Sequence, residues 1–430
     1  MAPSTDDIIR LLTNADQNQS SFILLSPDKP VDSTKGLSIT FDFYSYGGSG
    51  GDGLSFFVLD GAVGTVTKAG GFGGSLGYAN RTDGLVSLPG IAGAYVGIGF
   101  DEFGNYSNAS EGRVGGESLG ADSIAIRAGF NADPLQSYKY VTGAGQLPSI
   151  DNPVPGDLNR DNAKRSARID LTAAGLLSVK VDFNKDGDFD DVGETNAALQ
   201  NVDIKAANSG ILPSTLRFGF AAATGSFTNI HEVGNFRATT TSGDLLEISP
   251  TQTVGGGTGN STDKLTGGAG TDQIIGGGGS DVLTGSGGGD RFLYSGITRL
   301  AALSQSTLKS RDRITDFNSR EGDRIQLDFD DQLLTPNLPK GLFNAGNEKG
   351  SLRKAAKAAY ADKSFTKRGN QRLKPGEAVL FTQGSRTYIS VNDDKAVFSP
   401  GRDFLVDVTN IKLKAGDSGL GTLKVGNYFI

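Results

Sequence analysis

A nine-residue repeat between Thr258 and Leu293 constrains the fold of this chain more than any other feature of its sequence. The four blocks read TGNSTDKLT, GGAGTDQII, GGGGSDVLT and GSGGGDRFL. Glycines around each aspartate allow backbone conformations with positive φ, and an apolar residue follows two positions after the aspartate. This pattern is typical of a parallel β-roll, in which each repeat supplies a turn and a short strand. The repeated aspartates are Asp263, Asp272, Asp281 and Asp290.

These repeated aspartates predict calcium binding. In a roll, each carboxylate faces the space between stacked turns, where a hard cation can bind it together with backbone carbonyls. A flexible glycine linker is the alternative, but such a linker would not keep aspartate and apolar residues in phase over four repeats. The chain has no cysteine and a single histidine, His231, which excludes disulfides, thiol nucleophiles and the usual zinc sites. We therefore expect Ca²⁺, at several sites, to be the cofactor.

Short runs of alternating polar and apolar residues fill the segment 21–237. Clusters of Gly, Asp, Asn and Pro separate these runs, as they separate the strands of a β-sandwich or barrel. The 63 glycines among 430 residues agree with many tight turns. The clearest runs are LSITFDFYSY, LSFFVLD, AYVGIGFD, SIAIRAG, ARIDLTA, LLSVKVDF and LRFGFAAA.

The sequence divides into five parts, and we expect a mainly β chain. An N-terminal segment precedes the predicted sandwich, which is followed by a linker, the β-roll and a mixed, mostly β C-terminal module. Within that module, strands alternate around acidic turns, and the segment SLRKAAKAAYADK has helical spacing. The predicted boundaries are 1–20, 21–237, 238–254, 255–293 and 294–430.

The repeats and the segment after them resemble exported bacterial proteins. GGAGTDQII and its neighbours resemble the repeats-in-toxin (RTX), or hemolysin-type calcium-binding, family, and DRITDF, DRIQLDF, TYISVNDD and FLVDVTNI resemble a bluetail-type C-terminal module. The resemblance implies type I secretion through an uncleaved C-terminal signal, with folding in Ca²⁺ outside the cell. The first twenty residues lack a basic stretch followed by an apolar one, so no cleaved signal is expected. A secreted, extracellular protein, in some cases held at the cell surface, is the expectation.

The segment 21–237 resembles the legume-type (L-type) lectins in their bacterial version. Four motifs occur in the order found in that family, namely GDGLSFFVLDG, GGSLGY, GFDEFGNYSN and FAAATGSFTNIHEVGNF. The resemblance implies a concanavalin A-like jelly-roll sandwich that binds carbohydrate through loops at one end.

The lectin resemblance implies a set of sugar-binding residues. Asp52 accepts hydrogen bonds from neighbouring hydroxyls, and the N–H of Gly74 or Gly73 donates to one of the same oxygens. Asn105 donates its amide N–H, and Phe103 offers its ring face. The loop from Thr224 to Asn229 sets specificity, which adds Thr224, Gly225, Ser226 and Asn229. On local sequence alone, Asp52 could equally be a turn residue of GGDG.

The same resemblance implies a calcium site beside the sugar. Its ligands are the side chain of Asp101, the carbonyl of Phe103, the side-chain oxygen of Asn105, and Glu111. Two departures from the family pattern indicate that its second, transition-metal site is lost, because Gly99 and Ser123 stand where that family has Glu and His.

The stretch DFNKDGDFDD predicts a further calcium loop. Alternate oxygen-bearing side chains around a glycine at the sharp turn are the pattern of a Ca²⁺-binding loop, here in a hairpin between strands. An acidic turn without metal is the alternative. The predicted ligands are Asp182, Asn184, Asp186, Asp188 and Asp190. His231 is expected to be a structural hydrogen-bonding residue.

Three classes of function compete for this chain. A secreted, Ca²⁺-dependent lectin that recognises glycans in adhesion is favoured, with a structural surface protein rigidified by Ca²⁺ as the alternative. A glycoside hydrolase needs two carboxylates facing one bond, whereas Asp101 and Glu102 are adjacent on a strand and point to opposite faces. The chain is therefore expected not to be an enzyme.

Charge and hydropathy limit the partners. The formal net charge of −7 argues against nucleic acid, which needs basic clusters. No apolar run approaches the 18 residues of a membrane helix. The basic stretch 353–374 could contact anionic polysaccharide or lipid headgroups, although a solvated helix face is the favoured interpretation. The expected partners are glycans and a type I exporter.

Overall fold

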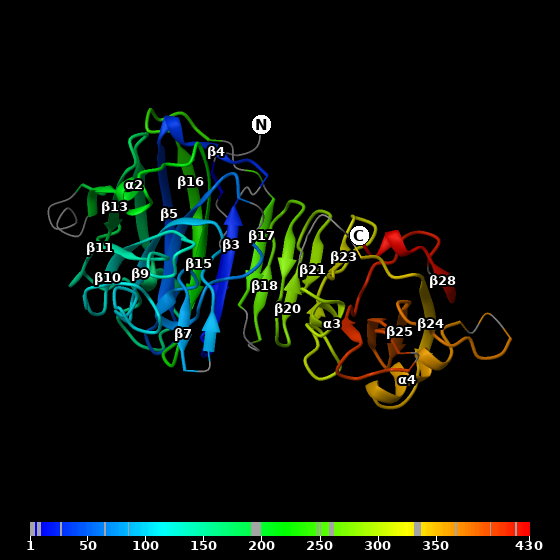
Figure 1. The fold of residues 1–430 in the computed structure, drawn as a ribbon. Helices are drawn as coiled ribbons and strands as arrows, with labels where there is room; N and C mark the ends of the chain where they lie inside the picture. The colour runs from blue at the N-terminus through cyan, green and yellow to red at the C-terminus, as the bar shows by residue number, and fades with distance from the viewer. Residues whose placement is uncertain are drawn as a thin grey trace. The chain divides into compact units, whose positions relative to one another are not determined.

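The computed structural model of the chain contains two compact units, Met1–Thr258 and Gly259–Ile430 (Figure 1). Each unit is described by itself. The structure describes residues 1–430 except 1–4, 7–9, 26–27, 64–65, 85, 191–198, 247–248, 250, 258–261, 331–336, 365, 367, 396 and 418.

The first unit is a sandwich of two mainly antiparallel sheets, as the alternating runs predict. In the first sheet, the strands occur in the order β1 (Thr5–Asp6), β16 (Ile230–Thr239), β5 (Leu37–Tyr46), β12 (Arg165–Leu171), β13 (Leu176–Asp182) and β14 (Leu199–Asp203), with β2 (Arg10–Thr13) also beside β16. In the second sheet, they occur in the order β11 (Tyr140–Ala144), β10 (Ser123–Ala128), β9 (Ala94–Asp101), β6 (Gly53–Asp60), β15 (Thr215–Ala223), β3 (Ser20–Leu25) and β17 (Gln252–Gly256), with β4 (Val31–Asp32) beside β15.

Short elements complete this unit. They are the hairpin of β7 (Arg81–Asp83) and β8 (Val86–Leu88), the helices α1 (Arg160–Ala163) and α2 (Ile204–Ala207), and the 3-10 turns Ser33–Lys35 and Gly73–Ser75.

Aromatic side chains fill the space between the two sheets. Phe41 of β5 lies 5.9 Å from Phe56 of β6 and 4.7 Å from Phe220 of β15, measured between ring centroids. Phe100 of β9 packs edge-on against the same Phe41 ring at 5.9 Å. Because side chains alternate along a strand, Phe57 points to the other face of the second sheet.

A second core covers that other face. Phe57, Leu76, Tyr78, Tyr106 and Tyr138 are all buried there, although only the first of them lies on a strand. Strands β6, β9 and β10 are consequently buried on both faces, whereas β12 of the first sheet alternates between buried and half-buried residues. The loops that form this cover also carry the predicted binding residues.

The boundaries of the sandwich unit differ from those predicted. Strand β2 lies in the predicted N-terminal segment 1–20 and pairs with β16. Strand β17 begins inside the predicted linker 238–254 and pairs with β3, so the linker contributes a strand. Both segments satisfy backbone groups of strands that would otherwise lie at a sheet edge, a requirement that local patterning does not reveal.

The second unit begins with a parallel β-roll. Strands β18 (Lys264–Thr266), β20 (Val282–Thr284) and β22 (Arg313–Ile314) form one ladder, and β19 (Gln273–Ile275), β21 (Arg291–Ser295) and β23 (Arg324–Asp328) form the other. Successive nine-residue repeats therefore alternate between two sheets, and the apolar residues Leu265, Ile274, Leu283 and Phe292 are buried. The predicted roll is confirmed in its architecture, but its ladders extend beyond residue 293 into β22 and β23.

The rest of this unit forms a mixed module on the ladder of β22. The strands continue in the order β27 (Phe404–Asp407), β26 (Arg386–Val391), β25 (Ala378–Gln383), β24 (Leu342–Glu348) and β28 (Gly421–Leu423). Helix α4 (Leu352–Ala361) packs on them, and α3 (Arg299–Leu303) and the 3-10 turn Val425–Asn427 complete the unit. The prediction of a mainly β fold with a helix in 351–363 is confirmed.

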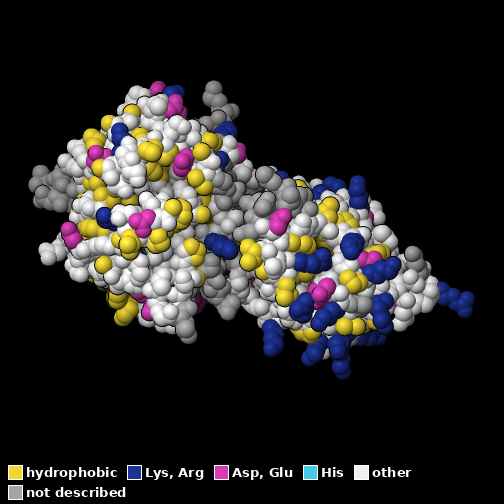
Figure 2. All heavy atoms as spheres, viewed as in Figure 1, with side chains coloured by type: hydrophobic (Ala, Val, Ile, Leu, Met, Phe, Trp, Pro, Cys, Tyr) yellow, Lys and Arg dark blue, Asp and Glu magenta, His cyan; other side chains and the backbone are white. Residues whose placement is uncertain are grey.

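The polar face of α4 is basic. Arg353, Lys354 and Lys357 are exposed, whereas Ala359 and Tyr360 are buried, in agreement with the predicted solvated helix face. Figure 2 shows Lys and Arg side chains gathered over this part of the second unit.

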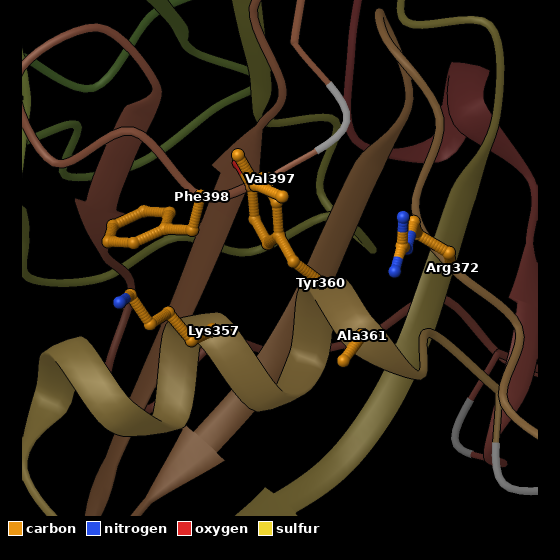
Figure 3. A pocket seen from close by; sticks show the side chains of 6 residues that line it. All are labelled: Lys357, Tyr360, Ala361, Arg372, Val397 and Phe398. Atoms are coloured by element: carbon orange, nitrogen blue, oxygen red, sulfur yellow. The ribbon is translucent and has the colours of Figure 1, made fainter.

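A cavity of about 390 Å³ lies beside α4. Lys357 and Phe398 border it on one side and Arg372 on the other, with Tyr360 between them (Figure 3). It contains none of the residues predicted for binding. Among the described residues, no helix is long and apolar enough to span a membrane.

Candidate functional site

The register of three neighbouring strands brings the predicted sugar loops together at one end of the second sheet. Gly53, the first residue of β6, pairs with Asp101 at the end of β9 and with Ala223 at the end of β15. The residues just outside these strand ends therefore meet, although they are far apart in the sequence. They comprise Asp52, the loop 102–122 between β9 and β10 (the Asn105 loop), and the loop 224–229.

Asp52 is the centre of this arrangement. Its side chain is buried, with 4% of the residue exposed, and its Oδ1 accepts a hydrogen bond of 3.2 Å from Asn105 Nδ2. Asp52 Oδ2 and Asn105 Oδ1 are also buried, yet neither has a hydrogen-bond partner in the structure. Burial raises the pKa of Asp52 to about 6, although the Asn105 hydrogen bond acts to lower it. Buried oxygens without partners are costly, which suits acceptors that a ligand completes.

Two glycines leave room for these acceptors. A Cβ atom on Gly74 would lie 2.3 Å from Asn105 Oδ1, and one on Gly225 would lie 2.6 Å from Asp52 Oδ2. Any other residue at either position would displace the acceptor. The N–H of Gly73 already donates to the Thr224 carbonyl at 3.1 Å, so Gly74 is the remaining candidate of the two predicted backbone donors.

Two exposed phenylalanines flank the acceptors. Phe103 is 42% exposed and Phe227 is 45% exposed, and their ring centroids lie 5.1 Å apart. Phe103 was predicted, whereas Phe227 was not singled out within the loop 224–229. Its signal is an aromatic residue in an otherwise small and polar loop, TGSFTN. Exposed rings beside polar acceptors suit a ligand with both apolar and hydroxyl surfaces.

Thr224 is corrected from a ligand-facing residue to a structural one. Its side chain is buried, and its hydroxyl donates to the Asp16 carbonyl at 2.6 Å while accepting from the Gln19 N–H at 3.0 Å. The hydroxyl thus joins the N-terminal segment to the loop. Gly225 lies against Asp52 Oδ2, and Ser226 is exposed; the part of Ser226 in sugar binding stays a prediction.

Asn229 is corrected in the same way. Its Nδ2 donates to Glu102 Oε2 at 2.7 Å, and its Oδ1 accepts from the Gly48 N–H at 2.9 Å. Glu102 Oε1 lies 2.7 Å from His231 Nε2, and His231 Nδ1 lies 2.5 Å from the Thr13 hydroxyl. The prediction that His231 is a structural hydrogen-bonding residue is confirmed. Glu102 belongs to this buried network.

The electrostatics of this network agree with its geometry. Burial acts to raise the pKa of Glu102, but the charge and hydrogen bond of His231 outweigh it, and the pKa is lowered. Glu102 is therefore an ionised structural partner. The predicted separation of Asp101 and Glu102 is thus observed, because Asp101 is turned into the Asn105 loop.

The predicted calcium ligands of the Asn105 loop are already engaged within the protein. Asp101 is fully buried; its Oδ1 accepts from the Gly104 N–H at 2.8 Å and its Oδ2 from the Tyr106 N–H at 2.6 Å. Burial raises the pKa of Asp101 to about 7, against the effect of these hydrogen bonds. Asp101 acts here as a brace for its own loop.

Glu111 is corrected as a metal ligand. Its Oε1 forms an ion pair of 2.9 Å with Arg81, and its Oε2 forms one of 2.8 Å with Arg113. Of the four predicted ligands, only Asn105 offers a buried side-chain oxygen without a partner. Because Ca²⁺ needs six to eight oxygens and two guanidinium groups lie beside this loop, the residues do not fit a calcium ion.

The predicted loop 182–190 has a similar internal arrangement. Asp182 is buried and accepts from the N–H groups of Lys185 and Gly187. Each next oxygen-bearing side chain accepts from the N–H two residues further on, and Asp190 also pairs with Lys180. Across the part of the chain that the structure describes, no group of three or more Asp, Glu or His side chains is placed to hold a metal ion. Calcium binding by Asn184, Asp186 and Asp188 stays a prediction.

The aspartates of the roll form two columns of buried carboxylates. In each column, Oδ1 of one aspartate accepts a hydrogen bond of 2.9 Å from the backbone N–H of the preceding member. The last members of the two columns, Asp312 and Asp323, were not predicted from the sequence. Each stands before an Arg-Ile pair much as Asp290 stands before Arg-Phe. One column contains Asp263, Asp281 and Asp312, and the other contains Asp272, Asp290 and Asp323.

These carboxylates repel one another. Burial and then the charges of Asp312 and Asp263 raise the pKa of Asp281 to about 9. Burial is also the first cause that raises the pKa of Asp290 to about 8. The Oδ2 atoms of Asp281, Asp290 and Asp312 are buried without a hydrogen-bond partner. Such oxygens call for protons or cations.

Comparisons with known proteins give lectin domains as structural neighbours over about half of the chain. The VIP36 exoplasmic/lumenal domain in its Ca²⁺/Man3GlcNAc-bound form is 15% identical, with 54% of this chain and 78% of that chain covered and a TM-score of 0.31. The metal-free form of lectin I-B4 from Griffonia simplicifolia is 18% identical, with 55% and 92% covered and a TM-score of 0.34. The potassium-bound Emp46p carbohydrate recognition domain is 16% identical, with 54% and 86% covered and a TM-score of 0.33.

No protein-family model matches the chain, and no curated protein matches it in sequence. The assignment of function therefore depends on the arrangement of this chain's own residues.

Proposed function

We propose that this chain is a carbohydrate-binding protein whose sugar site is built around Asp52. The observation that carries the proposal is the pair of buried acceptors without partners, Asp52 Oδ2 and Asn105 Oδ1, which lie beside an exposed aromatic pair. A sugar presents hydroxyl donors on its edge and C–H groups on its faces. These two kinds of surface match the two kinds of group at the site.

Each residue has a role that follows from its contacts. Asn105 Nδ2 is committed to Asp52 Oδ1, so Asp52 Oδ2 and Asn105 Oδ1 accept from hydroxyls, and Gly74 N–H donates. This assignment changes the role expected for Asn105, whose amide orients the carboxylate. Phe103 and Phe227 contact the apolar face of the ring.

The calcium dependence of the chain is proposed to lie in the roll. In these columns, neighbouring carboxylates raise the pKa of Asp281, and the Oδ2 atoms of Asp281, Asp290 and Asp312 are buried without a hydrogen-bond partner. Ca²⁺ held there would neutralise this repulsion and stabilise the second unit.

Export and location follow from the sequence resemblance. We propose that a type I exporter secretes the chain and that the roll folds in the calcium found outside the cell. A role in adhesion or recognition of cell-surface or matrix glycans is supported by the combination of a sugar site with an export module.

Two other functions have weaker support from the structure. A glycoside hydrolase requires two carboxylates that act across one glycosidic bond, and the Glu102 carboxylate is already engaged by His231 and Asn229 in a buried network. A structural surface protein without sugar binding would not need Asp52 buried with a free acceptor, given the cost of such a group.

The test is a glycan array with the full chain in excess Ca²⁺, together with a hydrolysis assay on every hit. Asp52→Asn removes one charge from the site and is expected to abolish binding, while Asp60→Asn, at the other end of the same strand, is expected to bind like the wild type. Binding that survives in Asp52→Asn would place the sugar elsewhere. Turnover of a bound glycan would show that the chain is an enzyme and not a lectin.

A further inference from the structure

The Asn105 loop needs a brace, because it is a long irregular connection that carries one wall of the sugar site. It runs from the end of β9 to the start of β10 and has buried backbone carbonyls that no sheet satisfies. In the L-type lectins, which the sandwich segment resembles, a metal ion gathers such oxygens, but the residues of this chain do not fit calcium there. The question is what gathers them instead.

Arg127 of β10 binds several of these carbonyls. Its side chain is completely buried, and its guanidinium donates to five backbone carbonyls, four of which belong to the Asn105 loop. A guanidinium has five N–H donors, so each has an acceptor. The acceptors are the carbonyls of Tyr106 at 2.8 Å, Asn108 at 2.9 Å, Val114 at 3.0 Å, Gly115 at 3.3 Å and, outside the loop, Tyr138 at 3.0 Å.

Arg113 also holds the Asn105 loop. Its side chain is also inaccessible to solvent, and it lies within the loop itself. Its Nη2 donates to the Asn105 carbonyl at 2.9 Å, and its Nη1 donates to Ser75 Oγ at 3.0 Å and to Glu111 Oε2 at 2.8 Å. This guanidinium therefore ties the residue that orients Asp52 to the turn that contains Gly74.

Tyr106 occupies the space beside Gly99. A Cβ on Gly99 would lie 2.3 Å from the Tyr106 ring, so an acidic side chain at this position could not coexist with the ring. The Tyr106 ring is fully buried, and the Arg127 guanidinium lies 5.4 Å from its centroid. The loss of the acidic residue at Gly99 and the gain of the ring are thus parts of one arrangement.

We infer that two buried arginines, Arg127 and Arg113, replace a metal ion as the cation that holds the sugar-site loop. Both are covalently attached, so the loop keeps its shape at any calcium concentration. A guanidinium gathers carbonyls with directional hydrogen bonds, as Ca²⁺ gathers them by coordination. Two fixed positive charges also oppose the entry of a divalent cation. Sugar binding by the sandwich is therefore independent of calcium, and this last statement rests on the proposed function.

Hydrogen–deuterium exchange of the full chain, read by mass spectrometry, tests the inference without any sugar. In wild type, amides of residues 104–116 should exchange at the same rate in excess Ca²⁺ and in excess EGTA. Arg127→Lys and Arg113→Lys should each accelerate exchange there by about tenfold or more in both conditions, as expected when charge-assisted hydrogen bonds are lost. Loss of protection in the wild-type loop on chelation would overturn the inference, even if both variants fail to fold.

Arg165→Lys is the matched control. Arg165 is another buried arginine of the sandwich, and it donates to backbone carbonyls of Ser149, Asp151, Asn162 and Lys164 rather than to the Asn105 loop. Exchange at 104–116 should be unchanged in this variant, and acceleration equal to that of Arg127→Lys would overturn the specific role. A wild type that binds no glycan refutes the proposed function but leaves the exchange result to decide this inference.

Discussion

The Asn105 loop and the β-roll both bury charge, and they do so in opposite ways. In the loop, the Arg127 and Arg113 guanidiniums face carbonyl oxygens and Glu111, so opposite charges and dipoles meet within the protein. In the roll, buried aspartates follow one another in columns, and the Oδ2 atoms of Asp281, Asp290 and Asp312 have no hydrogen-bond partner. The first arrangement is complete without a solute, whereas the second leaves buried carboxyl oxygens for protons or cations. We therefore propose that one chain combines a calcium-independent part with a calcium-dependent one.

The largest effect is expected from removal of calcium. In EGTA, the unfolding transition of the second unit should fall to lower temperature in calorimetry at neutral pH, because buried carboxyls whose pKa is raised to about 9 (Asp281) and about 8 (Asp290) must then take up protons for the unit to stay folded. The transition of the sandwich should shift little. Equal destabilisation of both transitions would erase the contrast between the two regions.

The next largest effect concerns Arg127 itself. Arg127→Met leaves five carbonyls without their donor and should lower the free energy of unfolding of the sandwich by about 3–5 kcal/mol. Chemical denaturation followed by tyrosine fluorescence can measure this loss. The roll transition should stay in place, and a matching loss in the roll would show that the variant acts on the whole chain.

Asp281→Asn should change the stability of the second unit in opposite directions with EGTA and with Ca²⁺. Asparagine retains an acceptor for the Asp263 N–H but removes a carboxyl that must take up a proton when no cation is bound, because its pKa is raised to about 9. The change should be on the order of 1–3 kcal/mol, stabilising in EGTA and destabilising in Ca²⁺. Thermal melts in both buffers measure it. The same sign in both buffers would mean that no cation binds beside this residue.

The affinity for sugar should depend on pH through Asp52. Its pKa is raised to about 6, and protonation converts an acceptor into a donor. Affinity should therefore be constant above pH 7 and should fall as pH drops through 6, by about tenfold per pH unit in the limit. Titration calorimetry with an array hit measures this profile, with EGTA present to keep the roll out of the comparison. A flat profile from pH 7 to 5 would contradict the role of Asp52 as acceptor.

The smallest effect is expected at the aromatic wall. Phe227→Ala should weaken sugar binding by about 3- to 10-fold, in line with the 0.5–1.5 kcal/mol of an aromatic contact. The exposed Phe130→Ala is the control, since it lies away from the site and packs near Tyr138. An unchanged affinity in Phe227→Ala would remove this ring from the site and leave Phe103 as the apolar surface.

Much of the fold could be predicted because the local periodicity of the sequence indicates the type of each element. The nine-residue step of the aspartates led to the parallel roll, and alternation led to the sandwich strands β5, β6, β9 and β15. The errors lie at the ends of these patterns. Strands β2 and β17 join sheets through long-range backbone pairing, and Asp312 and Asp323 extend the columns outside the nine-residue step that marked the repeats.

The candidate site could be predicted in part. Asp52, Asn105 and Gly74 were located from motifs, and the structure brings them together. Thr224 and Asn229 could not be sorted from Gly225 and Ser226, because a loop sequence does not say which side chains point inward. The engagement of Glu111 by two arginines was equally invisible, since its partners come from separate segments.

The sequence by itself determined the kinds of element, the oxygen-bearing residues of the roll and the residue types at the candidate site. These follow from periodicity and from the chemistry of single residues. Only the tertiary structure decided which charges meet. Arg127 lies on β10 and four of its carbonyl partners lie in the loop that precedes that strand, so its proposed part in replacing a metal depends on how the loop folds back over the strand and on burial. Electrostatic energy depends on distance and exposure, and neither is fixed until the chain has folded.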